Sequence, residues 1–131
     1  MDNIVIEKIW TDETFYEVRI KFVTEKVSAI HQTYINCGRL SKLSDKINEF
    51  IETKNTVSWS DSEKFKESSL ILELIKIDAL GHVMIHIDIR NEDYKCQCNL
   101  NTYLGNIISF SHKLTDFDRY EVGEKITLAS L

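Results

Sequence analysis

The 131-residue sequence contains no proline, and its four glycines stand far apart, at Gly38, Gly81, Gly105 and Gly123. Because phosphate loops and dinucleotide-binding turns need several glycines close together, the sequence provides neither. No Pro/Gly/Ser-rich linker divides the chain, and no internal repeat is visible. We therefore expect a single domain over residues 1–131. A chain of this length can bury roughly two-thirds of its unfolded surface without a disulfide or a metal ion.

Cysteine is also scarce, since Cys37, Cys96 and Cys98 are the only three and form no CxxC pair. An odd count argues against the disulfide framework of a secreted protein and favours reduced thiols. The first residues are acidic and lack the basic and apolar regions of a secretory signal. The apolar run Leu70–Ile75 is too short to span a membrane. These features predict a cytoplasmic protein that has no membrane partner.

The sequence has no excess of positive charge, because 16 Lys and Arg residues stand against 21 Asp and Glu residues, a formal net charge of −5. A surface that binds nucleic acid needs a basic stripe to displace counterions, and no such stripe is present. We therefore expect no nucleic-acid partner. Negative charge favours steering toward a basic partner, although a modest negative charge also serves solubility alone.

The spacing of apolar residues predicts the secondary structure. Tyr16–Val23 and His82–Arg90 alternate every second residue, which is typical of a strand with one buried face. Over Arg39–Thr53 the spacing changes to three and four, which predicts a helix with Asn36 as its N-cap. A second helix is predicted over Thr102–Asp116, capped by Asn101.

The remaining runs predict further strands. Leu70–Asp78 is apolar on both sides, which suits a central strand covered on both faces. With His82–Arg90 and Tyr94–Leu100 it forms an antiparallel meander joined by short hairpins. Shorter strands are predicted at Asn3–Trp10, Val27–Ile35 and Thr56–Ser60, and a weakly extended tail at Phe117–Leu131. The pattern predicts an α+β fold, an antiparallel sheet of about six or seven strands with two helices packed on one side.

The two tryptophans, Trp10 and Trp59, have two interpretations. Large aromatic side chains are mostly buried, so we expect both in the core or at its edge. The alternative is a role as interface anchors, because tryptophan is enriched at binding hot spots.

The strongest metal-binding pattern joins His82 and His86 to Cys96 and Cys98, because two histidines and two cysteines suit tetrahedral zinc. The strand period opposes this site, since the histidines share a polar face and the cysteines share the face of core residues. Two residues four apart on a strand also lie roughly 13 Å apart, too far to bind one ion together. We therefore expect no metal ion and no cofactor.

Catalytic signatures are equally absent from the sequence. No Gly-x-Ser-x-Gly elbow marks a nucleophile, and the carboxylate pair Glu92–Asp93 stands in a predicted turn. We expect no enzymatic activity. The alternative is a small ligand-binding or hydrolytic domain that uses His82 and His86 on the open sheet face.

Acidic residues gather in two stretches of the sequence. Asp88, Glu92 and Asp93 lie on or beside the clearest hairpin, and a second group follows the second helix. If the two stretches are neighbours in the fold, they form one acidic, partner-binding patch; otherwise they are a solvated rim. The predicted partner-binding residues are Asp88, Glu92, Asp93, Asp116, Asp118 and Glu121.

Several stretches resemble one protein family. They are Phe15–Phe22, the helix Leu40–Phe50, Leu80–Ile89 with its Leu-Gly-His turn, and the passage Cys96–Phe117 that ends in Ser-His-Lys-Leu-Thr-Asp-Phe. In these stretches the chain resembles the WapI-type immunity proteins of bacterial polymorphic-toxin systems. The resemblance implies a cytoplasmic inhibitor whose partner is a cognate toxin domain, in many such systems a nuclease with a basic cleft. It implies nothing about the oligomeric state.

Overall fold

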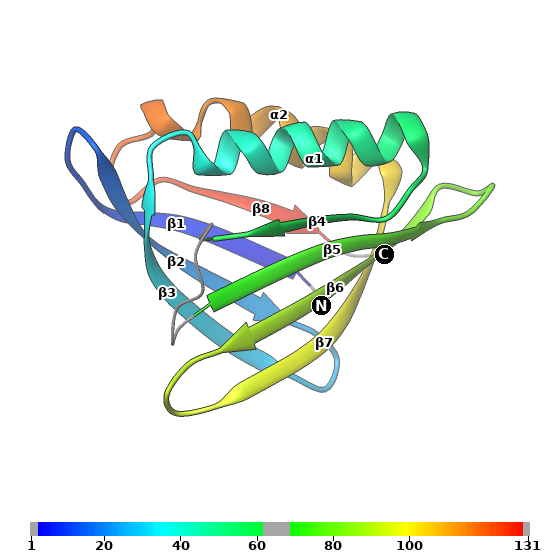
Figure 1. Ribbon diagram of the computed structural model, residues 1–131, viewed down its shortest axis with the longest axis horizontal. Coiled ribbons are helices and arrows are strands. Elements are labelled where there is room, and N and C mark those ends of the chain that lie inside the picture. Colours follow the sequence, from blue (N-terminus) through cyan, green and yellow to red (C-terminus); the bar gives the residue numbers. More distant parts are fainter. Residues whose placement is uncertain (1–2, 62–68, 130–131) are drawn as a thin grey trace.

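The computed structural model describes residues 3–61 and 69–129 as two β-sheets with two helices lying side by side along one side (Figure 1). In chain order the elements are β1 (Asn3–Thr11), β2 (Phe15–Val23), β3 (Ser28–Asn36), α1 (Arg39–Thr53), β4 (Val57–Ser60), β5 (Ser69–Ile77), β6 (His82–Arg90), β7 (Lys95–Tyr103), α2 (Leu104–Thr115), the 3₁₀ helix η1 (Phe117–Arg119) and β8 (Lys125–Ala129).

The predicted α+β class, with antiparallel strands and two helices, is confirmed. The strands of the described residues number eight and form two four-stranded antiparallel sheets, ordered β3-β2-β1-β8 and β4-β5-β6-β7, where we predicted one sheet. Each sheet is built on a meander of consecutive hairpins, β1-β2-β3 in one and β5-β6-β7 in the other. Residue spacing reveals such hairpins because they are local, but it does not show that the two meanders belong to separate sheets.

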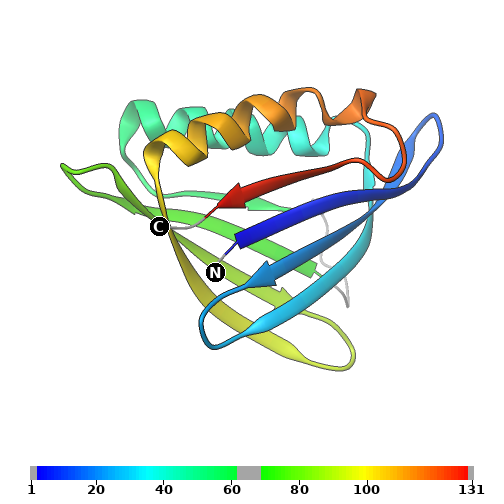
Figure 2. The ribbon, with the colours of Figure 1, turned by 180° about the vertical axis from the view of Figure 1, so that it is seen from behind.

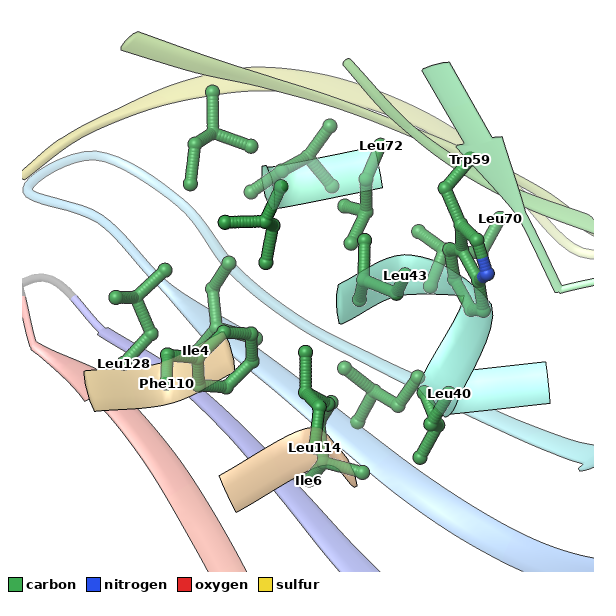
Figure 3. Close-up of a cluster of buried hydrophobic side chains, with 14 of the residues drawn as sticks. Ile4, Ile6, Leu40, Leu43, Trp59, Leu70, Leu72, Phe110, Leu114 and Leu128 are labelled. Carbon is green, nitrogen blue, oxygen red and sulfur yellow. The ribbon is translucent and has the colours of Figure 1, made fainter. Parts of the chain in front are cut away.

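One hydrophobic core fills the space between the sheets and beneath the helices. In each sheet one face is buried, and α1 and α2 turn their apolar stripes toward the same interior. Burying one such aliphatic side chain contributes about 1.5–3 kcal/mol. Figure 3 shows side chains from both sheets and both helices meeting there, with Ile4, Ile6, Leu40, Leu43, Trp59, Leu70, Leu72, Phe110, Leu114 and Leu128 labelled.

The two helices form where their spacing predicts them, but both predicted caps are wrong. Helix α1 covers Arg39–Thr53 as predicted, and its N-cap is Gly38 with a φ of 88°. Asn36 is the last residue of β3 instead. Helix α2 covers Leu104–Thr115, because β7 continues through Asn101 as far as Tyr103. A Ser44–Ser111 hydroxyl contact of 2.6 Å joins the two helices inside the core.

Strand β5 is central, between β4 and β6, as predicted. Only one of its faces is buried, by Leu70, Leu72 and Leu74, so the expectation of cover on both faces is wrong. Both helices pack on the interior side of the sheet, and Ile75 on this strand is 38% exposed. Trp59 on the neighbouring strand is in the core as predicted, and its indole N–H donates to the Arg39 carbonyl at 3.0 Å.

A buried polar contact joins the two sheets at one side. The His31 Nε2 atom on β3 lies 2.9 Å from the Asp61 Oδ2 atom, just after β4, and both side chains are almost fully buried. The other Asp61 carboxylate oxygen accepts the Leu70 backbone N–H at 3.1 Å, at the start of β5. Asp61 therefore satisfies a side chain of the first sheet and a main-chain donor of the second.

Candidate functional site

The structure places the six predicted partner-binding residues in two separate regions. Glu92 and Asp93 are exposed at the turn between β6 and β7, which we call the hairpin tip. Asp88 lies before it on the outer face of β6, paired with Arg90 at 3.2 Å. The other three, Asp116, Asp118 and Glu121, are exposed in and around η1. Figures 1 and 2 show the hairpin tip at the bottom of the molecule and η1 at the top, so the two groups form no continuous patch.

The group around η1 has acidic neighbours that the sequence did not reveal. The β1–β2 turn carries exposed Asp12 and Glu13, and it lies on the same side of the molecule as η1 in both views (Figures 1 and 2). Cys37 joins the turn to the start of α1, because its N–H donates to the Thr14 carbonyl at 2.9 Å. We call the resulting surface the acidic end, and it consists of Asp12, Glu13, Asp116, Asp118, Glu121 and Glu124.

Lys8 fixes this acidic end from the inside. Its side chain is fully buried, and the ammonium group donates to three main-chain carbonyls, those of Phe117 at 2.8 Å, Asp118 at 3.2 Å and Tyr120 at 2.8 Å. Three acceptors match the three N–H donors of a protonated lysine. Burial lowers the pKa of Lys8, and the negative charge of Asp118 opposes that shift. One lysine on β1 thus holds the η1 segment, which carries Asp118 and is flanked by Asp116 and Glu121.

Asp118 connects η1 to helix α1. One of its carboxylate oxygens accepts the backbone N–H of Gly38 at 3.1 Å. Gly38 has no side chain, and α1 has neither a side-chain cap nor an acidic residue in its first turn. The carboxylate therefore caps the helix from another element and lies at the positive end of the helix dipole.

The β1–β2 turn is held by its own aspartate. The Asp12 carboxylate accepts the backbone N–H groups of Phe15 at 2.7 Å and Thr14 at 2.8 Å. The Phe15 bond first and the Thr14 bond second lower the pKa of Asp12 below its ordinary value. The carboxylate is therefore charged at neutral pH and adds a fixed negative charge to the acidic end.

Cys37 has the setting of a candidate nucleophile that the sequence did not single out, because it is exposed and precedes the first turn of α1. Burial and the negative charge of Asp118 nevertheless raise its pKa, with Lys8 opposing. A raised pKa keeps the group as a thiol, whereas a nucleophile must be a thiolate. The local electrostatics therefore disfavour nucleophilic chemistry at this cysteine.

Exposed aromatic side chains lie next to the acidic end on the outer face of the first sheet. Trp10 is 44% exposed, so its predicted burial is wrong. Simple alternation would turn it inward with Ile6 and Lys8, but the β1–β2 register shifts between Lys8 and Trp10. This β-bulge moves Trp10 to the outer face, opposite Glu17. Tyr34 and Phe15 are exposed on the same face.

The histidines of the alternative function do not form a joint site. The His82 Nδ1 atom lies 2.8 Å from the Asp78 carboxylate, and the His86 Nδ1 atom lies 2.7 Å from the Asn99 side-chain oxygen. A shallow hollow of about 150 Å³ beside His82 includes neither His86 nor a nucleophile. Over residues 3–61 and 69–129, no group of three or more His, Cys, Asp or Glu residues could hold a metal ion.

A titration can show whether Asp78 pairs mainly with the His82 side chain, as in a catalytic dyad, or with the backbone N–H of His82, as in a structural turn. The backbone N–H of His82 is the main cause that lowers the pKa of Asp78 below 3.8, and the His82 side chain contributes less. We expect an NMR titration of His82→Ala to leave the Asp78 pKa below 3.8, because the backbone donor remains. The stabilisation from this carboxylate is present above pH 3.8 and is lost as pH falls through the folded-state pKa. A pKa that returns fully to 3.8 in the variant would instead favour a side-chain dyad.

Among the described residues, no helix is long and apolar enough to cross a membrane. No family model, curated protein or solved structure matches this chain.

Proposed function

We propose that this protein is an immunity protein, a cytoplasmic inhibitor that binds and neutralises a cognate toxin domain of a bacterial polymorphic-toxin system. The acidic end is the binding surface. The observation that carries the proposal is the convergence of six carboxylates from the β1–β2 turn and the η1 region on one side of the molecule. The carboxylates of the turn and those of the η1 region are separated by about a hundred residues in the sequence, and only the fold brings the two groups together.

Positive charges offset the six carboxylates of this surface only in part, and they include exposed Lys113 in the last turn of α2. Lys8 is buried, and Arg119 is exposed 3.9 Å from Asp116. Lys125 is exposed at the start of β8 and lies opposite Glu7 in the ladder. A field of this kind accelerates association with a basic protein and favours a matched orientation. A nuclease domain suits it as a partner, because a cleft that binds nucleic acid must itself be basic.

The acidic end is held in a fixed conformation, which also suits an inhibitor. Lys8 and Asp118 fix the η1 segment through main-chain contacts, and Asp12 fixes the opposing turn. A surface that is ordered before binding loses little conformational entropy in the complex. The exposed aromatics beside it provide the large, rigid side chains that dominate binding energy at protein interfaces.

The test is capture of the partner under native conditions. The tagged chain is incubated with lysate of its source organism, and proteins bound in one-to-one ratio are identified by mass spectrometry. We expect the C-terminal domain of a large secreted protein, and the purified chain should then abolish that domain's activity. No stoichiometric partner, in lysate where such toxins are shown to be expressed, would contradict the proposal.

A further inference from the structure

Three residues on adjacent strands form a row across the outer face of the first sheet. Trp10 on β1 lies opposite Glu17 on β2, and Glu17 lies opposite Tyr34 on β3. We call these three residues the aromatic row. Backbones two strands apart are separated by roughly 9.6 Å, yet the Trp10 and Tyr34 ring centroids are only 6.0 Å apart. The two rings therefore lean toward each other over Glu17.

The row keeps a large aromatic surface in contact with solvent. Trp10 is 44% and Tyr34 56% exposed, although each ring already contacts the other edge to face. Trp10 reaches this face only through the β-bulge, and bulges disrupt a ladder locally and re-aim a side chain. Without the bulge, the indole would face inward with the rest of the buried stripe of β1.

The row carries a negative charge, the partly exposed Glu17 carboxylate, and only one of its two oxygens has a protein donor among the described residues. Gln32 donates its side-chain N–H to the Glu17 Oε2 atom at 3.0 Å, and the part of the chain that the structure describes provides no hydrogen bond to Oε1. The nearest cation along β2, Arg19, is directed to Glu7 at 3.9 Å. Phe15 continues the exposed aromatic surface from Glu17 toward Asp12 and the acidic end.

An arginine side chain fits this combination best. A guanidinium group stacks on aromatic faces and pairs with a carboxylate through its N–H donors. An ammonium group is more strongly hydrated and has no plane to stack. An uncharged apolar residue would cover the rings but leave Glu17 in a drier environment with its second oxygen unpaired, which is costly.

We propose that the aromatic row is the receptor for an arginine side chain on the protein partner, seated on Trp10 and Tyr34 and paired with Glu17. The proposal rests on the proposed function for the identity of the partner as a basic protein, and it adds the chemistry of its central contact. The acidic end attracts the partner, and the aromatic row fixes its position.

The probes are two acetylated peptides, with three arginines or three lysines separated by glycines, added to the ¹⁵N-labelled full chain at low salt. The sequence has two tryptophans, and Trp59 is buried, so its indole resonance is an internal control. We expect the Trp10 indole resonance to shift saturably, with the arginine peptide bound about three- to tenfold more tightly than the lysine peptide. Glu17→Gln should weaken binding of the arginine peptide, measured at the Trp10 indole resonance, by a similar factor. Glu73→Gln on the second sheet should leave this binding unchanged.

Three results would overturn the inference. One is a peptide response confined to amides of the acidic end, such as those of Asp118 and Glu121, which leaves the proposed function intact and removes the aromatic row from it. Another is equal binding of both peptides at Trp10, which contradicts a guanidinium site. The third is the absence of any response at Trp10 at saturating peptide. None of these outcomes depends on capture of the toxin, so the two proposals fail separately.

Discussion

Replacement of His31 by leucine is expected to lower the free energy of unfolding by about 3–5 kcal/mol. The substitution leaves the Asp61 carboxylate almost fully buried, with the Leu70 backbone N–H as its remaining hydrogen-bond donor among the described residues. In the folded variant the carboxylate has neither the histidine nor the water that hydrates it in the unfolded chain. This uncompensated desolvation destabilises the folded state. Urea denaturation followed by tryptophan fluorescence measures the effect.

A double-mutant cycle separates loss of the contact from loss of side-chain volume. His31→Leu with Asp61→Leu removes both polar partners, and we expect the pair to be less destabilising than the sum of the two single variants. Additive single effects would contradict the interpretation that the 2.9 Å contact between the sheets is energetically coupled.

Replacement of Lys8 by methionine is expected to cost about 2–4 kcal/mol, because three carbonyls lose their donor, one of them in a buried hydrogen bond and two in partly buried ones. Methionine has a similar length and keeps most of the apolar packing against the rings of Tyr16 and Phe117. Urea denaturation measures the loss of stability. Hydrogen exchange should show faster exchange over residues 117–123 than elsewhere in the variant.

The matched control for this substitution is Lys21→Met, which removes an exposed lysine from the outer face of β2. Exposed substitutions of this kind usually change stability by less than about 0.5 kcal/mol. Equal denaturation midpoints for Lys8→Met and Lys21→Met would contradict the anchoring role of Lys8.

The elements that depend on local pattern were predictable from the sequence. Helix α1 has the predicted bounds Arg39–Thr53, and β6 the predicted bounds His82–Arg90, because in each case the apolar period matches one buried face. The β5-β6-β7 meander was also predictable, since hairpins pair neighbours in sequence. The division into two sheets was not predictable, because it depends on strand pairs far apart in sequence. Strand β8, near the end of the chain, pairs with β1, near its start.

The candidate site was only partly predictable for the same reason. Asp116, Asp118 and Glu121 were selected by their clustering in sequence, but Asp12 and Glu13 join them only through tertiary contacts. Trp10 was expected in the core or at its edge because large aromatic side chains are mostly buried, and a β-bulge after Lys8 turns it to the outer face instead. No composition signal marks such a bulge, whereas the neighbouring lysine at an inward position was a hint that the interior there is polar.

Binding through the acidic end is tested most directly by the association rates of two charge-reversed variants with the captured toxin domain. One variant carries Asp116→Lys and Glu121→Lys at the acidic end, and the other carries Glu92→Lys and Asp93→Lys at the hairpin tip. Both change the net charge equally. Asp118 is left intact because it caps α1, and Asp88 because it pairs with Arg90.

Stopped-flow association is measured over a series of salt concentrations. We predict that the acidic-end variant associates about tenfold or more slowly at low salt, with a weaker salt dependence, because steering depends on the local field. The hairpin-tip variant should stay within about twofold of the wild-type rate, because its charges are far from the contact. Slow association of the hairpin-tip variant alone, or equal rates for all three proteins, would contradict binding through the acidic end.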